Sequence, residues 1–119
     1  MFFGRYAVDD HYGGMAFGDE GARCAAMLAN PKVTTMVMGN HGVLVIGRTV
    51  AEAFNRLVFF ERAAETYIRA LQTGRPLRVL SEAVAEKTAQ EWESYPGYAE
   101  AHLREVKALL DEEGANYAT

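Results

Sequence analysis

His41 is the residue of this chain that is best placed for chemistry. It lies in the segment Gly39-Asn40-His41-Gly42, between the apolar stretches Val33–Met38 and Val43–Ile46. The flanking glycines and apolar stretches predict a loop at the end of a sheet, where an imidazole, a common metal ligand and proton carrier, can face a cleft. The residues alone leave a second interpretation open, a hairpin-loop histidine bonded to nearby backbone.

Several other polar residues have a structural explanation beside a chemical one. Asn40 suits a left-handed turn as well as a ligand contact. Glu61 lies mid-helix among aromatic residues, and we expect a buried carboxylate satisfied by Arg56, Arg62 or a backbone amide, in a structural rather than a catalytic role. Arg48 could attract a substrate phosphate, but its place in a turn favours a solvated side chain.

The two remaining histidines and one aromatic group complete the candidates. We interpret His11 and His102 as surface histidines. Trp92, Tyr95 and Tyr98 lie close together in sequence and can form an aromatic cluster. The cluster either packs against the core or the C-terminal segment, which we favour, or faces a partner.

The elements around His41 have strong local signals. A connection of four residues, Gly39 to Gly42, predicts an antiparallel hairpin, and the nearly continuous apolar character of its strands predicts cover on both faces. Thr49-x-x-Glu52 is a capping box that predicts a helix from about Thr49 to Thr73, packed on the hairpin. Apolar residues lie on more than one side of this helix, so it should contact several neighbours.

The remaining elements have weaker signals. Phe2–Val8 has the composition of a short strand. Asp19 can cap a helix that runs to about Ala29, and Ser81 can cap one that runs to about Tyr95. A charged helix from about Tyr98 to Glu113 should face solvent.

Composition indicates a single globular domain. The chain has 119 residues, of which 50% are hydrophobic and 24% charged, and its net charge of −4 argues against a general nucleic-acid binder. The single Cys24, interpreted as a small core residue, excludes an internal disulfide and fits a reducing cytoplasm. No apolar run could span a bilayer and no signal peptide is recognisable, so we expect a cytoplasmic protein without a membrane partner.

The segment from about Tyr6 to Leu80 resembles the class II aldolase/adducin family, which includes fuculose-phosphate aldolase and ribulose-phosphate 4-epimerase. The residues that carry the resemblance are Asn40-His41-Gly42, Gly47, Glu52-Ala53, Glu61 and Ala64. The resemblance implies an α/β chain that is part of a three-layer α/β/α fold, with an antiparallel sheet and packed helices. Residues 1–119 would be the C-terminal part of one such domain, with the sheet and long helix in 1–80 and a helical segment in 81–119.

The resemblance also implies a role for His41 as one of three ligands of zinc or another divalent metal. In the family, the other two ligands form an earlier His-x-His pair, and an acid/base glutamate and the phosphate-binding residues are also earlier. The sequence has no His-x-His pair. We therefore expect zinc in a complete protein and none in this chain alone, no catalytic residue here, and unknown substrate-binding residues.

Two function classes follow from the resemblance. The first is the C-terminal portion of a zinc-dependent enzyme for aldol cleavage or epimerisation of a small sugar phosphate or hydroxy acid, incomplete and inactive as given. The second is a non-enzymatic, adducin-like structural or partner-binding module. Family enzymes are typically tetramers, so the resemblance, together with the apolar strands and long helix, predicts a homo-oligomer rather than a monomer.

Overall fold

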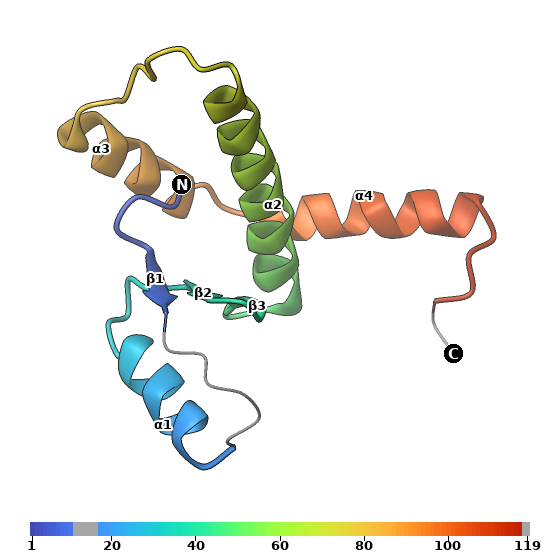
Figure 1. The fold of residues 1–119 in the computed structure, drawn as a ribbon. Helices are drawn as coiled ribbons and strands as arrows, with labels where there is room; N and C mark the ends of the chain where they lie inside the picture. The colour runs from blue at the N-terminus through green and yellow to red at the C-terminus, as the bar shows by residue number, and fades with distance from the viewer. Residues whose placement is uncertain (11–16, 118–119) are drawn as a thin grey trace.

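The computed structural model describes residues 1–10 and 17–117. Within these residues the chain forms one three-stranded sheet and four helices (Figure 1). In chain order the elements are β1 (Tyr6–Asp9), α1 (Phe17–Met27), β2 (Thr35–Met38), β3 (Gly42–Val45), α2 (Val50–Gln72), α3 (Glu82–Glu93) and α4 (Tyr98–Glu112). The architecture is therefore mixed α/β, as the sequence predicts.

The predicted hairpin is confirmed. β2 and β3 pair antiparallel, with Thr35 opposite Val45 and Met38 opposite Gly42. The expected cover on both faces holds for β2, where Thr35 and Met36 are fully buried. It does not hold for β3, whose apolar side chains are only half-buried, because β2 is the central strand and β3 lies at the edge.

The expectation of an antiparallel sheet is wrong for the pairing of β1 with β2. These strands run parallel, with Tyr6 opposite Thr35 and Asp9 opposite Met38, so the sheet is mixed. The connection between them contains α1, which carries the chain back to the same end of the sheet before β2 starts. β1 also starts later than expected, because a turn in which the Arg5 amide donates to the Phe2 carbonyl precedes it.

The long helix is confirmed at both ends. Thr49 is the N-cap of α2, its hydroxyl accepting a hydrogen bond from the Glu52 amide at 3.2 Å, and Thr73 is the C-cap. The other half of the capping box differs, because the Glu52 carboxylate accepts from the Arg48 amide at 2.9 Å rather than from Thr49. α2 rises from the end of β3 and contacts both β3 and α4 (Figure 1).

The first helix begins two residues before its predicted cap. α1 starts at Phe17, so Asp19 is not the N-cap but lies in the first turn, where a carboxylate is favourable to the helix dipole. Arg23 joins α1 to β1 through an ion pair with Asp9, with 2.8 Å between Nε and Oδ2. Cys24 is half-buried, so its interpretation as a core residue is only partly right.

The last two helices agree closely with the sequence. The Ser81 hydroxyl accepts from the Val84 amide at 3.4 Å and caps α3. α4 follows Gly97, which has a φ of 70°, and none of the residues in this fully described helix is buried. The buried hydrophobic residues of the described chain form a small core: Val33, Met36, Ala51 and Ala89. In the described segments no helix combines the length and the apolarity that a bilayer crossing requires.

Candidate functional site

His41 lies at the tip of the β2–β3 hairpin. Asn40 has a φ of 57°, which confirms the predicted left-handed turn. The His41 amide donates to the Met38 carbonyl at 3.1 Å and closes the turn, and the residue is exposed. The backbone therefore fixes the position of His41 at the sheet end, as the Gly-flanked segment predicts.

The hairpin tip is attached to the end of β1. The Gly39 amide donates to the Asp9 carbonyl at 2.7 Å, and a Cβ on Gly39 would lie 3.1 Å from the same oxygen, so the approach suits glycine. Asp9 is only 3% exposed, and its carboxylate pairs with Arg23, which raises the pKa of that guanidinium. The ends of β1 and β2 and the start of β3 thus meet beside His41.

The described residues around His41 do not complete a metal site. A catalytic zinc takes about three protein ligands. Within residues 1–10 and 17–117, no group of three His, Cys, Asp or Glu side chains could hold a metal ion. His11 lies outside the described residues. The ligand role of His41 therefore stays a prediction, and the described residues do not by themselves fit a zinc ion.

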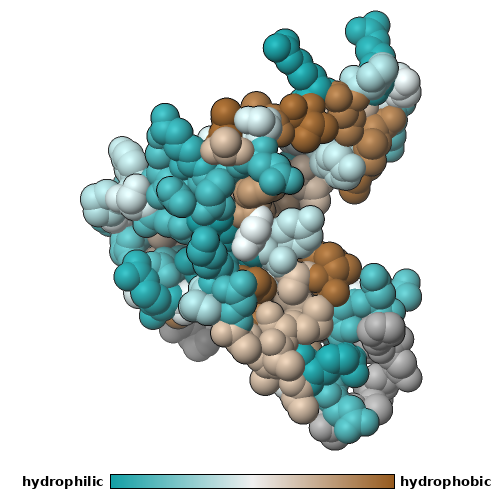
Figure 2. All heavy atoms as spheres, turned by 90° about the vertical axis from the view of Figure 1, so that its left-hand side faces the viewer, coloured by the Kyte–Doolittle hydropathy of each residue, from teal (hydrophilic) through white to brown (hydrophobic). Residues whose placement is uncertain are grey.

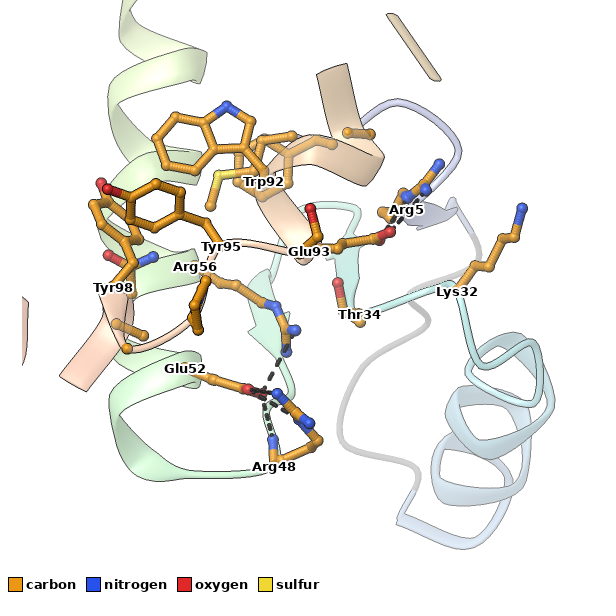
Figure 3. A pocket seen from close by; sticks show the side chains of 18 of the residues that line it. Arg5, Lys32, Thr34, Arg48, Glu52, Arg56, Trp92, Glu93, Tyr95 and Tyr98 are labelled. Carbon is orange, nitrogen blue, oxygen red and sulfur yellow. Dashed lines mark hydrogen bonds and ion pairs between the residues drawn. The ribbon is translucent and has the colours of Figure 1, made fainter. Parts of the chain in front are cut away.

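A cleft of about 660 Å³ lies at the opposite end of the sheet, where β1 and β2 begin and β3 ends (Figure 3). His41 is not among its described lining residues. The main charged and aromatic side chains of its wall are Arg5, Lys32, Arg48, Glu52, Arg56, Trp92, Glu93, Tyr95 and Tyr98.

The first turn of α2 supplies one charged group of the cleft. Arg48 contacts the Glu52 carboxylate through Nε at 2.9 Å and Nη2 at 2.5 Å, and Arg56 approaches the same carboxylate at 3.7 Å. The hydrogen bond from Arg48 lowers the pKa of Glu52. Arg48 is exposed, as expected, but it is engaged by Glu52 rather than only solvated, which weakens its role as a phosphate contact.

Arg5 supplies the second charged group and ties the N-terminal segment to α3. The residue is 3% exposed, and its guanidinium donates to Glu93 at 2.8 and 3.0 Å and also to Glu86. These bonds lower the pKa of Glu93, and that of Glu86 to about 2. Sequence reasoning missed this group because the partners are 81 and 88 positions away from Arg5.

The aromatic residues join three helices. Phe59 of α2 lies 5.7 Å from Trp92 and 5.9 Å from Tyr98, measured between ring centroids, and Trp92 and Tyr98 are 5.1 Å apart. Tyr95 lies 5.9 Å from Tyr98 and is largely exposed. The packing interpretation of the cluster is thus supported, and the same cluster forms one wall of the cleft (Figure 3).

Two expectations for single residues are wrong. Glu61 is exposed rather than buried, because it lies on a different side of α2 from Phe59 and Phe60, which contact Trp92 and Phe2. His102 is not a surface histidine. It is half-buried, and its Nδ1 lies 2.7 Å from Oδ1 of the buried Asn55. No sequence pattern connects these two residues, because the contact arises from the crossing of α2 and α4.

Comparison with known proteins places the chain in a family. No curated protein and no solved structure matches it. Residues 1–68 match the family described as Class II Aldolase and Adducin N-terminal domain, and this match covers more than half of the chain. It includes the sheet, the His41 hairpin and most of α2. The chain therefore belongs to the class II aldolase and adducin family.

Proposed function

We propose that this chain is the C-terminal part of a class II aldolase-like domain with three α/β/α layers, in which His41 is one ligand of a divalent metal, zinc. The family match and the fixed hairpin tip support the proposal. The left-handed Asn40 and the close approach of Gly39 to β1 hold the tip at one sheet end, so that a segment packed beside β1 can meet the imidazole.

The remaining parts of the active site come, in this proposal, from residues other than those described. The sequence contains three histidines and no His-x-His pair. General acid–base help alone contributes about 10²–10⁴-fold to a rate, so a chain without the full site should have no measurable turnover. The proposed reaction of the complete protein is aldol cleavage or epimerisation of a small sugar phosphate or hydroxy acid.

An adducin-like structural or partner-binding module is the second candidate. One observation favours it. The charged side chains Arg5, Arg48 and Glu52 in the cleft are engaged with one another or with other side chains of this chain. A surface built in this way can hold helices together without acting on a substrate.

The metal content of the protein encoded by the complete open reading frame distinguishes the two candidates. The protein is purified, dialysed against zinc and then against buffer, and its zinc is measured by mass spectrometry. We expect near-stoichiometric zinc in the wild type and at least a tenfold weaker affinity in His41→Ala. Asn40→Gly is the matched control, because glycine accepts a φ of 57° and keeps His41 in place.

Each result of this experiment decides between the proposals. Stoichiometric zinc in His41→Ala would show that the ligand assignment is wrong. A complete protein that binds neither zinc nor another divalent metal would exclude the enzyme proposal and leave the adducin-like module.

A further inference from the structure

The C-terminal half of α4 projects from the body of the molecule. α4 contacts α2, to which His102 ties it, and then extends away from α2 (Figure 1). Residues 103–113, here called the arm, carry apolar side chains three and four positions apart, at Leu103, Val106, Leu109 and Leu110. Leu109 is 58% exposed, and Leu103, Val106 and Leu110 are half-buried. The apolar side of the arm is therefore partly open to solvent.

A second apolar surface lies at the far end of α2. We call it the patch, and its members are 39% to 82% exposed: Tyr67, Ile68, Leu71, Leu77, Val79 and Leu80. Figure 2 shows hydrophobic side chains gathered at the top of the molecule, where Figure 1 places the loop between α2 and α3. An apolar surface of several adjacent residues usually marks an interaction site.

The end of the arm and the loop of the patch have opposite charges, while the first part of the arm contains the basic residues Arg104 and Lys107. The arm ends in the acidic run Asp111, Glu112 and Glu113. The patch contains Arg75 and Arg78, which lie in the loop among its apolar residues. Complementary charge of this kind guides association and fixes which surfaces meet. The arm points away from the top of α2, so in this structure it does not reach the patch of its own chain (Figure 1).

We propose that the arm of one copy docks on the patch of a second copy of this chain. In a two-fold pair each copy contributes one arm and one patch, so the same contact forms twice and the assembly closes. The ten helical residues of the arm, 103–112, span roughly 15 Å. Stable protein interfaces bury roughly 1,200–2,000 Å² in total, and a two-fold pair divides this area between two contacts. The proposal involves no metal ligand, so it stands or fails separately from the proposed function.

Charge reversal tests the pairing directly. Glu112→Arg/Glu113→Arg makes both the arm and the patch basic, whereas Arg75→Glu/Arg78→Glu makes both acidic. Each variant alone should dissociate at least tenfold more readily than the wild type in sedimentation velocity runs across micromolar concentrations. An equimolar mixture should form a heterodimer, because both contacts are then complementary. Basic residues are favourable at a helix C-terminus, so the arm stays helical.

Two further variants distinguish this contact from non-specific self-association. Leu109→Asp should weaken self-association at least tenfold, and Val50→Asp, an equally drastic change at an exposed residue at the other end of α2, should not. Circular dichroism checks that each variant is folded. The proposal is overturned if the wild type is monomeric, if the mixed variants do not associate, or if only changes at the β1 or β3 edge dissociate the oligomer.

Discussion

Nδ1 of His102 lies 2.7 Å from Oδ1 of Asn55, and this contact joins α4 to α2. Asn55 is 4% exposed, and the imidazole lies beside Phe54 and Phe59, with ring centroids 5.3 and 6.1 Å away. A polar pair enclosed by aromatic rings has little access to water, so neither side chain could easily replace this hydrogen bond with one to water. The pair therefore fixes where α4 crosses α2 and, with it, the direction of the arm.

Removal of either partner should destabilise the chain. We expect Asn55→Ala and His102→Ala each to lower the free energy of unfolding by about 1–2 kcal/mol, because the remaining polar group loses its partner. Urea denaturation followed by circular dichroism measures the change, and Lys107→Ala, on the exposed surface of the same helix, is the control. A double-mutant cycle with a coupling below about 0.5 kcal/mol would show that the contact is unimportant.

Gly47 should not tolerate a side chain. A Cβ at this position would lie 2.6 Å from the Ala53 amide nitrogen and 2.9 Å from the Thr49 carbonyl oxygen. Both are backbone atoms at the start of α2, so the helix must shift. We expect Gly47→Ala to lower the free energy of unfolding by about 1–3 kcal/mol in urea denaturation. Gly42→Ala meets no atom within 4 Å and should remain near wild type; equal effects would contradict the steric argument.

Stability should fall in acid because of the contact of Arg5 with Glu86. Arg5 lowers the pKa of Glu86 from 4.5 to about 2. A carboxylate whose pKa is lower in the folded state contributes stability that is present above the unfolded pKa and is lost as pH falls toward the folded pKa. We therefore expect the midpoint temperature of unfolding to decline from about pH 5 to about pH 2.

Calorimetry of Glu86→Gln measures how much this residue contributes to the decline of the midpoint temperature in acid. The variant should lose less stability than the wild type over the same pH range. Glu82→Gln, an exposed change in the first turn of the same helix, is the matched control. An undiminished decline in Glu86→Gln would refute the assignment.

Zinc should not stabilise the 119-residue chain. Binding to the native state raises stability with the ratio of ligand concentration to dissociation constant, and one imidazole binds zinc only weakly. At about 0.1 mM zinc we expect the midpoint temperature to rise by less than about 1 °C in a thermal-shift measurement. A rise of about 5 °C that disappears in His41→Ala would mean that this chain contains a complete site.

The parts of the fold that sequence predicts well are local. The hairpin follows from the four-residue connection after Met38, and the left-handed turn follows from Asn40. The long helix follows from the cap at Thr49 and the end near Thr73. Each of these signals lies within a few residues of the structure it determines, so a single chain segment is enough to recognise it.

The parts that sequence did not predict depend on distant contacts. The parallel pairing of β1 requires knowledge of where the chain returns after α1. The burial of Arg5 depends on α3, and the burial of His102 depends on the crossing with α2. Glu61 has apolar neighbours in sequence but is exposed, because only the sides of α2 that carry Phe59 and Phe60 are covered, by α3 and by the N-terminal segment.

The mixed sheet has a consequence for the order in which the chain folds. The β2–β3 hairpin closes through four residues, whereas Tyr6 and Thr35 must meet across a connection of roughly thirty residues, which is slower to close. β1 should thus join a hairpin that is already formed. Its amides should also exchange with solvent deuterium before those shared by β2 and β3, so that opening of β1 precedes global unfolding.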